Sequence, residues 1–100
     1  MKIERDAPPK MTIEVFAERH DLTMQISERS SYLVDELGLE PLYVRFKNTD
    51  IAEAGYIRGV SGDGWTEREA VADYRRQISG RRLKVDNRYY LDVPELLPSP

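Results

Sequence analysis

The sequence predicts one small α+β domain with the order helix, three antiparallel strands, helix and an extended C-terminal segment (α-β-β-β-α). Two stretches, 12–20 and 66–79, place apolar residues at helical spacing, and segments between them alternate apolar with polar residues. Alternation is the pattern of a half-buried strand, whereas a period near 3.6 is that of a helix buried on one face. A single antiparallel sheet with both helices on one face would bury both apolar stripes.

The domain boundaries follow from length and from proline placement. A chain of 100 residues has the size of a single domain. We expect a flexible leader over residues 1–10, which are polar and include a proline pair, and a flexible tail over 94–100, which holds three prolines. The folded domain would span residues 11–93, and its extended C-terminal segment would begin near residue 83.

The first helix is predicted at 12–20. Thr12 is a suitable N-cap, because its hydroxyl can accept a hydrogen bond from an amide of the first turn. Glu14 places a negative charge where the helix dipole favours one. The apolar register of this helix consists of Ile13, Phe16, Ala17 and His20.

The first strand is predicted at 22–29, where apolar and polar residues alternate. Residues 30–42 are ambiguous, because they are rich in leucine but are punctuated by Gly38 and Pro41. We expect a short helical turn near 32–37.

The second and third strands are predicted at 43–47 and 56–60, and we expect them to pair as a hairpin. Residues 48–50 are of types that are common in turns. Residues 51–54 would then be either a loop or an extension of a strand. Residues 61–64 contain two glycines and predict a loop that leads into the second helix.

The second helix carries the clearest local signal in the chain. Thr66 and Glu69 form a capping box, in which the threonine hydroxyl accepts from the amide of Glu69 and the glutamate reaches back. Trp65 and Ala70 stand at the two positions of a hydrophobic staple. Gly80 is placed to end the helix, since glycine readily takes the left-handed conformation found after a helix C-terminus.

Several chemistries are excluded or disfavoured by composition. The sequence contains no cysteine, which excludes disulfides, thiol catalysis and cysteine metal sites. His20 is the only histidine, and its place in a helical apolar register predicts a structural role, because catalysis would need a nucleophile and an orienting group beside it. We therefore predict no enzyme, no catalytic residue, no metal site and no cofactor.

The same composition bears on the compartment. A chain without cysteine fits the reducing cytoplasm. No apolar run approaches the length of about 18 to 20 residues that a membrane span requires. We predict a cytoplasmic protein without a membrane partner.

Charge is divided unevenly along the chain. Residues 1–74 contain 9 basic and 15 acidic residues, whereas residues 75–100 contain 6 and 3. Basic residues next to Tyr89 and Tyr90 form a combination that single-stranded nucleic-acid grooves use. The structural reading is that arginines near a helix end cap its carbonyls while the others are solvated. The candidate nucleic-acid-binding residues are Arg75, Arg76, Arg81, Arg82 and Lys84.

The ambiguous stretch from Tyr32 to Leu42 is both apolar and acidic. Exposed leucine and tyrosine beside acids suit a protein interface, and the acids would also suit a surface that mimics DNA. The structural interpretation is a local insertion packed on the core. The candidate partner-binding residues are Tyr32, Asp35, Glu36 and Glu40.

Residues 62–74, with Gly64, Thr66, Glu69 and Ala70, resemble the strand-to-helix turn of HicB-like antitoxin domains. The same region, continued to Leu83, is similar to small phage and prophage proteins. The order α-β-β-β-α is also similar to the double-stranded-RNA-binding fold, but that family has basic residues at the start of its second helix. This chain holds two glutamates there. The resemblance implies a small phage-type accessory protein, and many of these bind and block a host protein.

We therefore predict a small non-enzymatic interaction protein. It would be a phage-type accessory factor or inhibitor, similar in role to anti-CRISPR inhibitors, that binds a host protein such as a component of a nucleic-acid machine. The alternative is a nucleic-acid-binding module that uses the basic cluster between residues 75 and 84.

Overall fold

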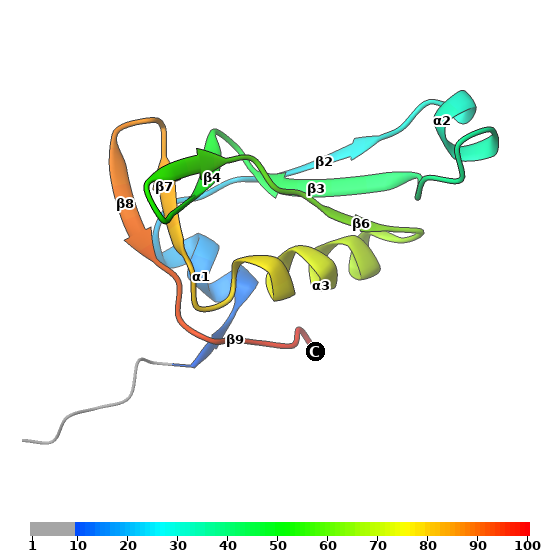
Figure 1. The fold of residues 1–100 in the computed structure, drawn as a ribbon. Coiled ribbons are helices and arrows are strands. Elements are labelled where there is room, and N and C mark those ends of the chain that lie inside the picture. The colour runs from blue at the N-terminus through cyan, green and yellow to red at the C-terminus, as the bar shows by residue number, and fades with distance from the viewer. Residues whose placement is uncertain (1–9) are drawn as a thin grey trace, which may run out of the picture.

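The computed structural model describes residues 10–100, so the predicted leader over 1–10 lies outside the described residues apart from Lys10. It has an α+β fold, which confirms the predicted class (Figure 1). The elements are, in chain order, β1 (Met11–Thr12), α1 (Ile13–Arg19), β2 (Met24–Glu28), α2 (Ser31–Asp35), β3 (Leu42–Phe46), β4 (Thr49–Glu53), β5 (Tyr56–Arg58), β6 (Gly62–Gly64), α3 (Glu67–Ile78), β7 (Arg82–Val85), β8 (Tyr89–Asp92) and β9 (Leu96–Leu97).

A three-stranded antiparallel sheet, in the order β2-β3-β6, forms one half of the domain. In its central strand, Val44 lies opposite Ile26 of β2 and opposite Gly62 of β6. Helix α3 packs against β6 and β3 (Figure 1). Gly62 and Gly64 permit this close approach, because a Cβ atom on either residue would overlap the backbone of α3.

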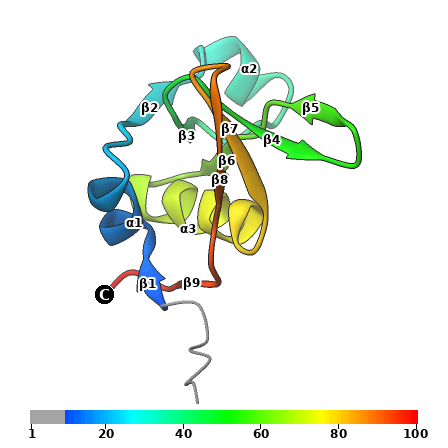
Figure 2. The ribbon, with the colours of Figure 1, turned by 90° about the vertical axis from the view of Figure 1, so that its left-hand side faces the viewer.

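A four-stranded antiparallel sheet, in the order β5-β4-β7-β8, forms the other half (Figure 2). The chain passes from β3 to β4 at Lys47 and Asn48, where Asn48 takes a positive φ of 53°. Strands β4 and β5 form a hairpin across Ala54 and Gly55, and β7 and β8 form a second hairpin across residues 86–88. Strand β7 also pairs with β4, which joins the two hairpins into one sheet.

The C-terminal residues pair with the beginning of the described chain. Strand β9 runs parallel to β1, with Leu96 opposite Met11. The Leu96 side chain is only 2% exposed, and its amide donates a hydrogen bond to the Ser79 hydroxyl. The sequence predicted a flexible tail over 94–100, but this segment is held to the domain at β9.

One hydrophobic core joins the two sheets and the helices α1 and α3. Its aromatic centre is Phe46 of β3, whose ring centroid lies 6.4 Å from that of Phe16 and 5.4 Å from that of Tyr74. The Tyr74 hydroxyl accepts a hydrogen bond of 3.1 Å from the amide of Phe46, so the polar end of this buried ring is satisfied. The other buried apolar side chains are Met11, Ile13, Val44, Ile51, Ala70, Ile78, Leu83, Val85, Val93 and Leu96.

Because of Tyr74, the free energy of unfolding of the domain should fall as the pH rises into the alkaline range. Burial raises the pKa of its hydroxyl above the ordinary value, although the hydrogen bond from the Phe46 amide acts in the opposite direction. Since the folded-state pKa lies above the unfolded value, this contribution is fully present below pH of about 10 and is lost as pH rises further. We expect Tyr74→Phe to flatten the alkaline fall in the free energy of unfolding, measured by urea unfolding across that range.

The same substitution has a second effect at neutral pH. It leaves the buried amide of Phe46 without its acceptor, which costs about 1–3 kcal/mol. Tyr56→Phe is the matched control, because Tyr56 is exposed, and it should change neither quantity. An alkaline fall that is equally steep in Tyr74→Phe and Tyr56→Phe would contradict the assignment.

Both predicted helices and the three predicted strands are confirmed, the third strand, predicted at 56–60, being β5. Helix α1 begins after Thr12, whose hydroxyl accepts from the amide of Val15. Helix α3 begins after Thr66 with both hydrogen bonds of the capping box, and Gly80 follows its end with a φ of +72°. Strands β2 and β3 match the strands predicted at 22–29 and 43–47, and α2 matches the predicted helical turn.

The predicted order of three strands is wrong, because the described residues form nine strands. The expected hairpin between 43–47 and 56–60 does not form: β5 pairs with β4, and β3 pairs with β2 and β6. Residues 61–64, predicted as a loop, contain β6. Glycine-rich β6 has almost no side chains in which alternation could appear, and β4 begins with residues that also favour turns.

Candidate functional site

Residues 30–40 form a projecting segment between β2 and β3, which we call the arm. It contains α2, whose N-cap is Ser30, with the Ser30 hydroxyl accepting from the amide of Leu33 at 3.4 Å. None of the five residues of α2 is buried. The arm stands at the end of the molecule that is far from β8 (Figure 1). It is therefore an exposed extension of the sheet and not an insertion packed on the core.

The arm exposes apolar and acidic side chains together. Tyr32 is 63% exposed, and Leu37 and Leu39 are also exposed. Asp35 and Glu36, two of the predicted partner-binding residues, are exposed beside them. Three of the four residues predicted from sequence thus lie on the exposed part of the arm, and the structure adds the two leucines to it.

One arginine, Arg29, joins the two ends of the arm at its base. The Arg29 guanidinium donates to the carbonyl of Glu40 at 2.7 Å and pairs with Asp63 of β6 at 2.5 Å. It also lies over the ring of Tyr43, 4.7 Å from the centroid. The Arg29 amide donates to the carbonyl of Pro41. These contacts hold the two ends of the arm together and fix them to the sheet, and no local sequence pattern indicates them.

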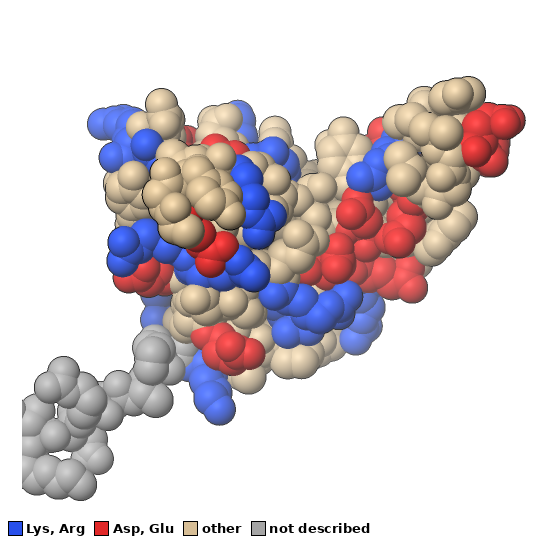
Figure 3. Space-filling model, viewed as in Figure 1, with Lys and Arg blue, Asp and Glu red and all other residues tan. Residues whose placement is uncertain are grey.

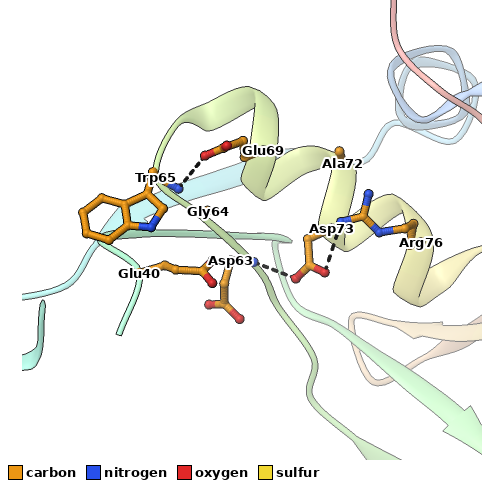
Figure 4. Close-up of a pocket in the computed structure, with 8 residues that line it drawn as sticks. All are labelled: Glu40, Asp63, Gly64, Trp65, Glu69, Ala72, Asp73 and Arg76. Atoms are coloured by element: carbon orange, nitrogen blue, oxygen red, sulfur yellow. Dashed lines mark hydrogen bonds and ion pairs between the residues drawn. The ribbon is translucent and has the colours of Figure 1, made fainter. Parts of the chain in front are cut away.

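A hollow of about 400 Å³, which we call the acidic groove, lies where the base of the arm meets β6 and the first turns of α3 (Figure 4). Figure 4 shows the ring of Trp65 at one end of the groove, next to Glu40 and Asp63, and Arg76 at the other end. Its lining residues are Glu40, Asp63, Gly64, Trp65, Glu69, Ala72, Asp73 and Arg76.

Glu40, the fourth residue predicted for partner binding, belongs to this groove and not to the exposed tip of the arm. Its carboxylate takes part in no ion pair among the residues that the structure describes. The position of Glu40 at the arm base links the two surfaces, so that the arm and the groove form one continuous candidate interface.

The other carboxylates of the groove are held by hydrogen bonds. Glu69 accepts from the amides of Trp65 and Thr66 at 2.9 and 3.2 Å. Asp73 accepts from the amide of Asp63 at 2.9 Å and lies 3.6 Å from the Arg76 guanidinium. Four carboxylates face only two guanidinium groups, those of Arg29 and Arg76, so the groove carries net negative charge.

Charge is also separated over the molecular surface. Figure 3 shows acidic side chains at the tip of the arm and below its base. Basic side chains gather over the other end of the molecule and below the acidic region in the same view (Figure 3). A partner that approaches the arm therefore meets a negative surface, which favours basic partners and slows acidic ones.

Trp65 has a different role from the one predicted by sequence. It was expected to pack on Ala70 as a hydrophobic staple, but it is 64% exposed while Ala70 is fully buried. The capping box fixes the backbone here, and the indole extends to the edge of the groove (Figure 4). Large exposed aromatic side chains are the residues that most often anchor protein interfaces.

The predicted nucleic-acid-binding residues do not form one cluster of free cations. Arg76 pairs with Asp73, Arg81 with Glu53 and Arg82 with Asp92. The Arg82 guanidinium lowers the pKa of the Asp92 carboxyl below its ordinary value. The two remaining cations also have intramolecular contacts: Arg75 donates to the Leu96 carbonyl, and Lys84 lies 5.6 Å from the ring centroid of Tyr90.

His20 has the structural position that was predicted for it. It is the C-cap of α1, half-buried, with its ring centroid 4.6 Å from that of Phe16. Among residues 10–100, no three His, Asp or Glu side chains are grouped so that they could hold a metal ion. Within that same range, no helix has the length and apolar character needed to cross a membrane.

Comparison of the chain with protein-family models, with curated proteins and with solved structures finds no match in any of the three.

Proposed function

We propose that this protein is a non-enzymatic interaction protein that binds a host protein through the arm, in the manner of a phage-type accessory factor or inhibitor. The observation that carries the proposal is the exposure of Tyr32, Leu37 and Leu39 on a segment with no buried residue in its helix. Apolar side chains gathered on a projection contribute nothing to the core, and their burial by a partner is favourable.

The contacts of Arg29 at the base of the arm, which we call the Arg29 clamp, support the same proposal. A flexible loop loses conformational entropy when it binds, whereas a loop whose ends are already fixed loses less. Arg29 fixes both ends of the arm through Glu40 and Pro41. The arm is therefore presented in one orientation before a partner arrives.

The test is a tagged pull-down from host lysate, with and without nuclease. We expect a stoichiometric protein that survives nuclease treatment, and we expect Asp35→Lys with Glu36→Lys to abolish its retention. Both carboxylates are exposed, so the thermal unfolding midpoint should hardly change. The loss would come from like charges facing a basic partner surface.

The matched control reverses two exposed carboxylates that lie outside the arm, Glu18 and Glu95. Glu18→Lys with Glu95→Lys changes net charge by the same amount and should leave retention unchanged. If both double variants lose the partner equally, net charge and not the arm determines binding.

The alternative proposal, a nucleic-acid-binding module, is decided by the same experiment. It would use Arg75, Arg76, Arg81, Arg82 and Lys84, and nucleic acid would be retained until nuclease is added. That binding would weaken steeply as salt rises. We rank it second because three of the five cations are paired with carboxylates.

A further inference from the structure

We propose that the acidic groove receives a lysine- or arginine-rich segment of a partner protein, with one cationic side chain lying against the indole of Trp65. This inference rests on the proposed function, because it names the chemistry of the partner at the surface where the arm joins the sheet. The occupant is a protein segment and not a nucleic acid, since phosphates would be repelled by the carboxylates of the groove.

The first argument is charge. Glu40, Asp63, Glu69 and Asp73 line the hollow, and the guanidinium groups of Arg29 and Arg76 offset only half of their charge. Arg76 lies at the end of the groove away from Trp65 (Figure 4). Arg29 pairs with Asp63, which lies next to Trp65 in Figure 4, so this end also contains one cation. Glu40 takes part in no ion pair among residues 10–100, so an incoming cation meets uncompensated negative charge at Glu40.

The second argument is that the acceptors are already oriented. The Glu69 carboxylate is held by two backbone amides of the turn from β6 into α3, and the Asp73 carboxylate by the amide of Asp63 in β6. Asp63 is held by Arg29. Groups fixed before binding lose little freedom on binding. Glu40 has no cationic partner among residues 10–100, so its carboxylate is available to a cation from outside.

The third argument is the indole of Trp65. A tryptophan face attracts lysine and arginine side chains more strongly than other aromatic rings do. Trp65 is 64% exposed at the edge of the acidic groove, where carboxylates would hold a cation close to the ring. A basic side chain suits this combination, because its apolar stem can pack on the ring while its charged end is paired with a carboxylate.

Trp65 is also the probe for the experiment, because it is the only tryptophan in the chain. Heptalysine and hepta-arginine peptides are titrated into the full-length protein while Trp65 emission is recorded, with heptaglutamate as the control peptide. We expect a saturable change with both basic peptides and none with heptaglutamate. The affinity should fall as salt rises from about 20 mM to about 200 mM, because exposed charges are screened over that range.

Two variants assign the binding to the groove. Glu40→Gln should weaken binding of hepta-arginine by about three- to fivefold, while Glu18→Gln, which removes the same charge from an exposed site on α1, should leave it unchanged. Trp65→Leu should weaken binding of a fluorescein-labelled hepta-arginine peptide, read by anisotropy, by about two- to fivefold. Thermal unfolding verifies that each variant is folded.

The outcomes separate this inference from the proposed function. Absence of a saturable change with both basic peptides overturns the groove inference, as does an equal effect of Glu40→Gln and Glu18→Gln. If the arm-dependent partner is still retained from lysate in that case, only the groove inference fails. If the peptides bind as expected but no arm-dependent partner is retained, the proposed function fails and the groove inference stands.

Discussion

Gly62→Ala should lower the free energy of unfolding by about 3 kcal/mol, the upper end of the usual cost of overpacking a core. A Cβ atom at this position would overlap the carbonyl oxygen of Ala70 and the amide nitrogen of Tyr74. Both are backbone atoms inside a hydrogen-bonded helix, so neither can move aside as a side chain would. The substitution must push α3 away from β6 and thereby loosen the packing around Tyr74.

Urea unfolding followed by circular dichroism measures this effect. Gly59→Ala is the matched control, because the nearest atoms to its added Cβ are side-chain atoms of Arg45 and Asp50, at 3.3 and 3.4 Å, and not backbone atoms of a helix. That variant should change the free energy of unfolding by less than about 0.5 kcal/mol. Equal stability of the two variants would show that α3 does not pack on β6 as closely as described.

Leu96→Ala should cost about 3 kcal/mol, within the range measured for buried leucines in other proteins. Leu96 is 2% exposed and belongs to the same core as Met11. Its removal would leave a cavity beneath the parallel pair of β1 and β9. The expected loss is large for a residue so close to the C-terminus, where a flexible tail would show none.

The neighbouring residue supplies the control. Leu97 has the same side chain but is 39% exposed. Leu97→Ala should therefore cost less than about 1 kcal/mol, because it removes less apolar area from contact with protein. Thermal or urea unfolding of the two variants distinguishes them directly, and similar small losses in both would mean that β9 is not bound to the core.

Sequence predicted the helices well because their signals are local. The capping box of Thr66 and Glu69 and the glycine at position 80 depend on residues within one or two turns. The N-cap of α1 at Thr12 is equally local. Such features are set by backbone groups that need a partner wherever a helix ends.

Strands were predicted less well because pairing is not local. The glycines of β6 are required by the approach of α3, and this contact lies outside any short window of sequence. Strand β9 is two residues long among prolines, and only its pairing with β1 identifies it. Periodicity reveals a strand only when one face is buried over several residues.

The candidate site also has features that local sequence predicts and features that depend on distant contacts. The composition of the arm allowed either an exposed interface or an insertion packed on the core, and Tyr32, Asp35 and Glu36 lie on an exposed segment. The groove could not be predicted, because Glu40, Asp63 and Asp73 come from three separate elements. Two ion pairs of the basic cluster join residues that are far apart in sequence, Arg81 with Glu53 at 28 positions and Arg82 with Asp92 at 10. Only the pair of Arg76 with Asp73 is local.

Because Arg29 ties the arm to the sheet, residues of the core and residues of the arm are constrained differently. Residues of the core must satisfy packing, but α2 has no buried residue, and Arg29 ties the ends of the arm to the sheet. Substitutions of the exposed residues between 31 and 37 should therefore weaken the fold little, as long as Arg29 and Asp63 are kept. The exposed sequence of the arm can in this sense diverge, or be replaced by design, on a scaffold that stays unchanged.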